Sequence, residues 1–371
     1  MPHNPTTEKR KDWFSMSITA LVVDDSAFMR QLIKKILETD PEIKVVGVAS
    51  NGEDALKKVD FFDPQVVTLD LEMPQMDGLT CLEQMMAEKP RPVVIISSWA
   101  KEGAEETLKA LELGAVDFIT KPGITSPEDF WELKDEIIQR VKSASLAHPE
   151  RANVIKQKKP STQITKVRKA ASARANTNAP KVVCIGASTG GPRALQYILT
   201  HLPGDFQLPI LIAQHMPEEF IRIFAARLSG LGPLKIKVAE EGDLLIPGRA
   251  LIAPSVLQTG LVKIGNEVSI KLTEESTIYR PSIDHLFLSV AKVFKGDAVS
   301  VLLTGMGADG ARGLKELRLL GARTIAEAEE TCVIYGMPRV AVEMEAVEYI
   351  YPLDRIPGLL CSLANQGTTP S

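Results

Sequence analysis

Three polar residues in the C-terminal half could together perform acyl transfer. Ser188, His215 and Asp309 each follow a short run of β-branched and other apolar residues. A serine hydroxyl is a weak nucleophile unless a neighbouring base accepts its proton, and a third group must orient that base. The carboxyl ends of parallel strands meet at one edge of a sheet, so the three side chains can come together although 27 and 94 residues separate them.

Each of the three residues also has an ordinary structural interpretation. A serine before Gly-Gly is often a helix N-cap, and an aspartate in a glycine-rich loop is typical of a turn. A lone histidine can belong to the surface or the core. Their joint occurrence at three strand ends favours a catalytic site.

The glycine-rich segment Gly186–Pro192 formally fits G-x-S-x-G, a weak signal by itself. The chain order Ser, His, Asp differs from the Ser, Asp, His order of α/β-hydrolases, so that family is not assigned. Pro192 stands where a Walker A loop needs Lys, and the spacing is not G-x-G-x-x-G. We expect these glycines to let backbone N–H groups at a helix start approach a developing oxyanion.

A second polar cluster is predicted in the N-terminal half. Asp24 and Asp25 follow its first strand, and the other members stand at the ends of later strands: Asp70, Ser97 and Lys121. Carboxylates that converge repel one another unless a divalent cation lies between them, and oxygen ligands suit Mg²⁺. Such a site could accept a phosphoryl group on one carboxylate. The alternative is that each aspartate only caps the following helix.

Both halves alternate strands and helices, which predicts parallel sheets covered on both faces. The strands expected in the first half are Ile18–Val23, Ile43–Ala49, Gln65–Leu69, Pro92–Ser97 and Asp117–Ile119, and its last helix is Pro127–Lys142. In the second half we expect strands Lys181–Ile185, Leu208–Ala213, Ala298–Leu303 and Arg323–Ala326, and antiparallel pieces at Ala250–Ala253, Leu261–Ile264 and Val268–Leu272.

The predicted fold class is therefore α/β, with two doubly wound parallel-sheet domains, flavodoxin-like and Rossmann-like, the second carrying a small antiparallel insertion. Residues 151–180 hold eight basic and no acidic residues and few large apolar ones, which predicts a flexible linker. The expected divisions are a tail at 1–16, a domain at 17–142, the basic linker at 143–180 and a second domain at 181–365.

Composition and charge exclude several classes of protein. The chain has 371 residues, 44% hydrophobic and 24% charged, and a net charge of −4, which disfavours a nucleic-acid or membrane-surface role for the whole chain. No apolar run approaches the ~18 residues of a membrane span, and the polar first fifteen residues do not predict a signal peptide. Four widely spaced cysteines indicate a reducing compartment, and we expect the cytoplasm.

Residues 17–140 resemble the receiver domain of bacterial response regulators through VVDDSAFMR, TLDLEMPQMDG, PVVIISS and ITKP. The resemblance implies that Asp70 is the phosphoacceptor, that Asp25 and Asp70 hold Mg²⁺ with Asp24 nearby, and that Lys121 binds the phosphate. It further implies that Ser97 and Phe118 form a switch pair.

Residues 181–360 are similar to the catalytic domain of CheB-type, chemotaxis protein-glutamate methylesterases through GASTGGP, AQHMP and LLTGMGADGA. The resemblance implies a catalytic triad of Ser188, His215 and Asp309 and no cofactor for the esterase chemistry. It implies a phosphorylation-regulated hydrolase that removes methyl esters from glutamates of methyl-accepting chemoreceptors and deamidates particular glutamines. Expected partners are the cytoplasmic domains of those receptors and a chemotaxis-type histidine kinase, with no nucleic acid and no membrane insertion.

Two other functions remain open at this point. A receiver can precede a DNA-binding output domain, but no helix-turn-helix pattern follows the linker. The second domain could also be an inactive scaffold that docks on receptors. The intact set of Ser, His and Asp argues against this function.

Overall fold

The computed structural model describes residues 17–97, 101–121, 130–149 and 180–365, which form two α/β domains. In the N-terminal domain, five parallel strands lie in the order β2-β1-β3-β4-β5, the flavodoxin-like order. These strands are β1 (Ile18–Val23), β2 (Ile43–Ala49), β3 (Val66–Leu69), β4 (Val93–Ser97) and β5 (Asp117–Thr120). The helices are α1 (Ala27–Leu37), α2 (Gly52–Phe62), α3 (Gly78–Glu88), α4 (Lys101–Leu113) and α6 (Lys134–Ser145).

Local sequence signals explain where three of these helices begin. Side chains of Ser26, Asn51 and Asp77 each accept a hydrogen bond from a backbone N–H in the first turn of α1, α2 and α3. Strand β3, between α2 and α3, is apolar and covered on both faces, and all four of its residues are buried. This arrangement leaves the polar residues that follow each strand at one edge of the sheet.

The C-terminal domain has a seven-stranded sheet in the order β14-β13-β12-β6-β7-β9-β8, and every strand pair in it is parallel. Its strands are β6 (Val182–Ala187), β7 (Ile210–Gln214), β8 (Lys235–Val238), β9 (Arg249–Ile252), β12 (Ala298–Leu302), β13 (Arg323–Glu327) and β14 (Tyr349–Tyr351). The helices are α8 (Gly191–Thr200), α9 (Glu218–Leu231), α10 (Ile283–Phe294), α11 (Ala311–Leu319), α12 (Met337–Glu343) and α13 (Ile356–Ala364). The α/β fold class with two parallel-sheet domains is confirmed.

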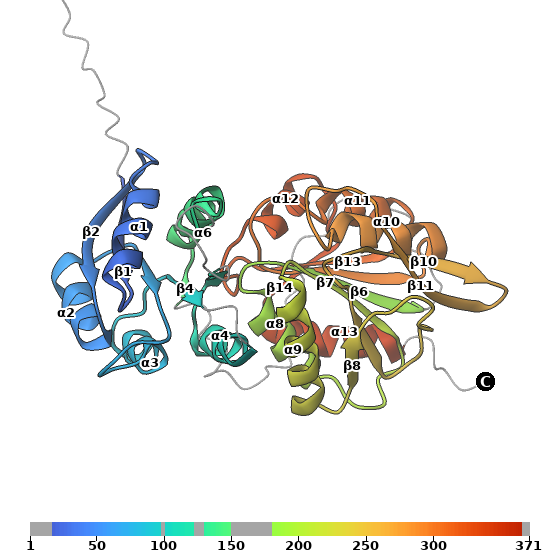
Figure 1. The fold of residues 1–371 in the computed structure, drawn as a ribbon. Coiled ribbons are helices and arrows are strands. Elements are labelled where there is room, and N and C mark those ends of the chain that lie inside the picture. The colour runs from blue at the N-terminus through green and yellow to red at the C-terminus, as the bar shows by residue number, and fades with distance from the viewer. Residues whose placement is uncertain (1–16, 98–100, 122–129, 150–179, 366–371) are drawn as a thin grey trace, which may run out of the picture.

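The small antiparallel insertion is a hairpin of β10 (Gln258–Ile264) and β11 (Glu267–Thr273), which projects from the end of the domain (Figure 1). The prediction that Ala250–Ala253 is antiparallel was wrong: β9 pairs in parallel with β7 and β8. Two strands, β8 and β14, were not predicted. These strands have four and three residues, too few for a reliable periodicity, so their place in the sheet depends on tertiary pairing.

The predicted end of the last helix in the first half, Lys142, also differs from the structure. Helix α6 continues to Ser145, past the expected linker start at residue 143, because Ser143 and Ala144 are buried. The first residues of the predicted helix Pro127–Lys142, the N-terminal tail and most of the predicted linker lie outside the described residues.

The two domains pack directly against each other, with α4 of the first facing α8 and α9 of the second (Figure 1). The Arg227 guanidinium bonds both carboxylate oxygens of Glu112, at 2.7 and 2.5 Å. The rings of Phe118 and Phe220 lie 4.3 Å apart between centroids. Apolar side chains of both domains thus form one continuous buried cluster. Across the described ranges, no helix is long and apolar enough to cross a bilayer.

Candidate active site

Ser188, His215 and Asp309 form a continuous chain of hydrogen bonds at the carboxyl edge of the larger sheet. Ser188 follows β6, His215 follows β7, and Asp309 lies between β12 and α11. His215 Nδ1 lies 3.1 Å from Ser188 Oγ, and His215 Nε2 lies 2.8 Å from Asp309 Oδ2. Strands β12, β6 and β7 are adjacent in the sheet, so their loops converge at the point where the strand order reverses.

Asp309 is held as an ionised acceptor. Its Oδ2 also accepts the Ile283 N–H at 2.8 Å, and its Oδ1 accepts the Asp284 N–H at 2.9 Å and the Ser282 hydroxyl at 3.2 Å. Burial opposes ionisation, but the hydrogen bond from His215 and those from the α10 amides outweigh it and lower the pKa of Asp309.

The ionisation of Asp309 fixes the tautomer of His215. A carboxylate can only accept hydrogen bonds, so His215 Nε2 carries the proton that faces Asp309. Nδ1 is then the unprotonated nitrogen, and it faces the Ser188 hydroxyl. The arrangement can therefore move a proton from Ser188 to His215.

Glycines let the neighbouring turns approach Ser188 closely. Gly190, at the start of α8, has a φ of +78°, which favours glycine. A Cβ at Gly305 would lie 2.7 Å from the Ser188 Cβ, so only glycine fits there without movement. The Ser188 N–H donates to the Thr304 carbonyl at 3.1 Å, which ties the β6 and β12 loops together.

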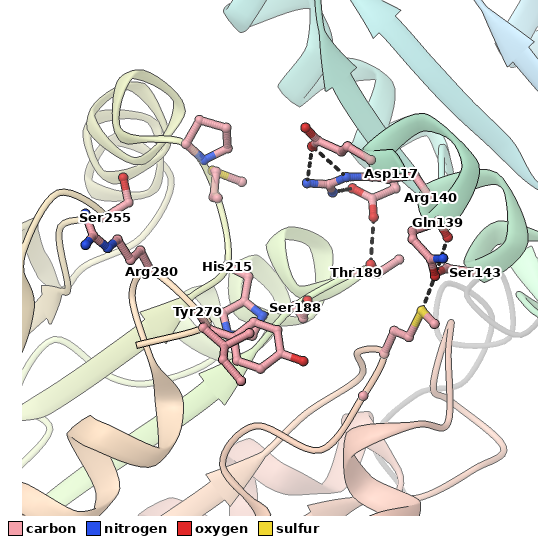
Figure 2. A pocket seen from close by; sticks show the side chains of 16 residues that line it. Asp117, Gln139, Arg140, Ser143, Ser188, Thr189, His215, Ser255, Tyr279 and Arg280 are labelled. Atoms are coloured by element: carbon pink, nitrogen blue, oxygen red, sulfur yellow. Dashed lines mark hydrogen bonds and ion pairs between the residues drawn. The ribbon is translucent and has the colours of Figure 1, made fainter. Parts of the chain in front are cut away.

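Ser188 and His215 face a cleft of about 600 Å³ between the two domains (Figure 2). Its far wall comes from the N-terminal domain and includes Asp117 and Arg140. Asp117 Oδ2 accepts the Thr189 hydroxyl at 2.6 Å, and its Oδ1 lies 2.5 Å from an Arg140 nitrogen. The first domain is thus anchored one residue away from Ser188.

The acidic residues of the N-terminal domain also come together. One carboxylate oxygen from each of Asp24, Asp25 and Asp70 lies within 4.8 Å of the others. The Lys121 ammonium lies 3.0 Å from Asp24 and 2.6 Å from Asp70. Burial raises the pKa of Asp70 to about 6, although the Lys121 charge opposes that shift.

The predicted switch pair lies on neighbouring strands. Ser97 is the last residue of β4 and pairs with Thr120, while Phe118 is buried on β5 and packs against Phe220 of the C-terminal domain. The sequence did not indicate the Asp117–Thr189 bond, nor that the Tyr279 ring stacks on His215. Tyr279 lies in an irregular segment without periodicity, so no sequence signal marks it.

Comparisons with known proteins agree with this architecture. The family model "CheB methylesterase" matches residues 183–360, and the model "Response regulator receiver domain" matches residues 20–129. A protein-glutamate methylesterase/protein-glutamine glutaminase of Halalkalibacterium halodurans is 44% identical over 91% of this chain and 96% of its own length. One from Pyrococcus abyssi is 42% identical over 92% of each chain. The crystal structure of the Thermotoga maritima CheB methylesterase catalytic domain is 38% identical, covers 50% of this chain and 100% of its own, and has a TM-score of 0.49. By its similarity to full-length relatives, the chain belongs to the protein-glutamate methylesterase/protein-glutamine glutaminase family.

Proposed function

We propose that this protein is a phosphorylation-regulated serine hydrolase that removes methyl esters from chemoreceptor glutamates and deamidates particular receptor glutamines. The observation that carries the proposal is the hydrogen-bonded chain of Ser188, His215 and Asp309, which opens on a cleft. Family membership supplies the substrate class. Both reactions are acyl transfers at a γ-carbonyl carbon, so one set of residues serves both.

The reaction proceeds through an acyl-enzyme. His215 Nδ1 accepts the Ser188 proton while Oγ bonds to the substrate carbonyl carbon. Backbone N–H groups of the glycine-rich turns near Ser188 stabilise the negative charge on the carbonyl oxygen. His215 then returns the proton to the leaving oxygen or nitrogen, and methanol or ammonia departs. Water, deprotonated by His215, attacks the ester carbon, and the proton returns to Ser188 as the glutamate carboxylate leaves. Asp309 stabilises the cationic form of His215.

Asp70 is the proposed phosphoacceptor, and Asp25 and Asp70, with Asp24 beside them, would hold Mg²⁺. The residues fit the ion because three carboxylates converge within 4.8 Å, a set of hard oxygen ligands. Bound there, Mg²⁺ would supply positive charge that neutralises the phosphoryl oxygens. Lys121 supplies a further positive charge to the same oxygens. The phosphodonor would be a chemotaxis-type histidine kinase in the cytoplasm, a location that four free cysteines support.

Regulation follows from the position of the first domain over the cleft. In the described arrangement Arg140 and Asp117 line the wall opposite Ser188, so the first domain forms one side of the cleft that a receptor segment would enter. Phosphorylation of Asp70 adds charge next to β4 and β5, where Ser97 and Phe118 would respond as the switch pair. Because Phe118 packs on Phe220, movement of Phe118 would loosen the contact between the domains.

The experiment that tests the activity is methanol release from receptor-containing membranes whose glutamates carry radiolabelled methyl esters. The purified chain should release labelled methanol, and should do so faster with acetyl phosphate and Mg²⁺ present. Retention of all label under both conditions would contradict the proposed function.

The Asp70→Asn variant should release methanol at the unphosphorylated rate and should not respond to acetyl phosphate, because the amide cannot accept the phosphoryl group. The Asp60→Asn variant is the matched control, since Asp60 is an exposed aspartate on α2 that forms an ion pair with Lys89. It should respond like the parent. An Asp70→Asn variant that is still activated by the phosphodonor would contradict this role.

A charge-swap pair tests whether the domain interface restrains activity. Glu112→Arg places two cations against each other, which should weaken the interface and raise the unphosphorylated rate about 3- to 10-fold. Adding Arg227→Glu restores opposite charges and should return the rate toward that of the parent. If the single variant has the parent rate, the contact does not restrain the enzyme.

A further inference from the structure

The His215 ring is covered on one face by an aromatic side chain that the proposed mechanism does not use. The Tyr279 and His215 rings are stacked, with centroids 4.8 Å apart and an angle of 4° between their planes (Figure 2). Tyr279 is 38% exposed and lines the cleft, so the stack lies at the surface where substrate would enter. Both nitrogens of His215 are engaged in the ring plane, by Ser188 and Asp309, so the ring face is the remaining contact.

The segment that carries Tyr279 is tied to the residues that hold Asp309. The Tyr279 carbonyl accepts hydrogen bonds from Gln258 Nε2 at 3.0 Å and from the Thr277 hydroxyl at 2.6 Å. Gln258, which is buried, also accepts the Ser282 N–H at 2.9 Å. The Ser282 hydroxyl in turn donates to Asp309. The segment 277–282 therefore orients both Tyr279, which contacts the ring face of His215, and Asp309, which contacts its Nε2.

The far end of the Tyr279 ring reaches the loop after β12. Its hydroxyl oxygen lies only 3.2 Å from where a Cβ at Gly307 would stand, and Gly307 has a φ of +88°. The ring thus spans the space between His215 and the loop that carries Asp309. A flat ring stacked on one face of the imidazole restricts its rotation about the Cβ–Cγ bond.

We propose that Tyr279 is a positioning residue for His215, which fixes the plane of the imidazole and favours its protonated form during acyl transfer. The inference rests on the proposed function, because His215 becomes a cation only when it accepts the Ser188 proton. The face of an aromatic ring carries partial negative charge and attracts a cation placed over it. The stack therefore stabilises the imidazolium more than the neutral imidazole. Because His215 becomes cationic as Ser188 attacks the substrate, this difference lowers the activation barrier of acyl transfer.

Charged groups from several elements also face the cleft. Asp309 approaches His215 directly; Arg280 follows Tyr279, and the N-terminal domain contributes Asp117, Glu136 and Arg140. Substitutions at position 279 leave all of these charges in place. A change in the pH dependence of activity can therefore be assigned to the ring.

The test replaces Tyr279 with Phe, Leu and a series of increasingly fluorinated phenylalanines in the full-length chain. Tyr279→Phe should keep kcat within about threefold, because the ring remains. Tyr279→Leu should lower kcat about 3- to 30-fold with a smaller change in KM, and should move the acidic limb of the pH–rate profile to lower pH. Fluorination keeps the ring shape but weakens its negative face, so kcat should fall stepwise. Equal rates across the fluorinated series would overturn the electrostatic role, and a parent-like Tyr279→Leu variant would overturn the whole proposal.

A second readout needs no substrate and so separates this inference from the proposed function. The chain has five histidines, and NMR of the intact protein can follow the pH at which each ring becomes protonated, with His215 identified from its loss in His215→Gln. Tyr279→Leu should lower that pH for His215. Tyr197→Leu is the matched control, because Tyr197 stacks on His201 outside the cleft, with centroids 4.1 Å apart; it should affect His201 and leave His215 and the activity unchanged. No change at His215 in Tyr279→Leu would contradict the proposal even if methanol release had never been observed.

Discussion

The Ser188→Ala variant should release methanol about 10⁴- to 10⁶-fold more slowly than the parent, the size of loss that removal of a serine nucleophile causes in enzymes of this mechanism. The reason is that no acyl-enzyme can form without Ser188 Oγ. His215 and Asp309 would remain in place, because the bonds that hold Asp309 come from Ile283, Asp284 and Ser282 rather than from the serine. The measurement is the initial rate of labelled methanol release from methylated receptor membranes.

Ser255→Ala is the matched control for this variant. Ser255 lines the same cleft, but its N–H and hydroxyl bond the Glu218 carboxylate at 2.8 and 3.3 Å instead of contacting His215. Its loss should change the rate less than about threefold, as expected for a substitution outside the reacting groups. A Ser188→Ala variant with activity within tenfold of the parent would rule out the nucleophile proposed here, whatever Ser255→Ala does.

The sequence could predict which residues stand at strand ends, because strand runs in a doubly wound fold are apolar and end abruptly in polar residues. That was enough to nominate Ser188, His215 and Asp309, and the structure brings these side chains within hydrogen-bonding distance. The sequence could not predict the strand order that makes β12, β6 and β7 neighbours, because strand order depends on pairing between distant segments. The roles of the three residues remain predictions until variants are measured.

The contacts that surround the site were beyond the reach of sequence patterns. The bond between Thr189 and Asp117 joins two domains, and the stack of Tyr279 on His215 joins an irregular segment to a strand end. Neither involves a local spacing, and both depend on how whole elements dock. The same reason explains the error at β9, whose short apolar run looks alike in a parallel and an antiparallel sheet.

Asp309→Asn should lower the rate of methanol release about 10⁴-fold while leaving the fold intact. Each oxygen of Asp309 accepts two hydrogen bonds: Oδ2 from His215 and the Ile283 N–H, Oδ1 from the Asp284 N–H and the Ser282 hydroxyl. An asparagine has only one acceptor oxygen, so its NH₂ group must face backbone N–H donors on one side or the other.

The geometry decides which tautomer of His215 results. If the NH₂ group of the Asp309→Asn variant faces His215, Nε2 must accept and Nδ1 must carry the proton, so Nδ1 can no longer receive the Ser188 proton. If the NH₂ group faces Asp284 instead, it opposes the Asp284 N–H, and the negative charge that stabilises the imidazolium is still lost.

Asp284→Asn is the matched control for Asp309→Asn. It removes a neighbouring carboxylate whose Oδ1 accepts the Gly313 N–H at 2.7 Å, a bond that the asparagine oxygen can keep. Because the Asp284 side chain does not contact His215, we expect a rate within about threefold of the parent. Equal losses in the two variants would mean that the carboxylates act only by stabilising the start of α10. A large loss in Asp309→Asn alone, with both variants folded by circular dichroism, would place the effect on the His215 tautomer and its cationic form.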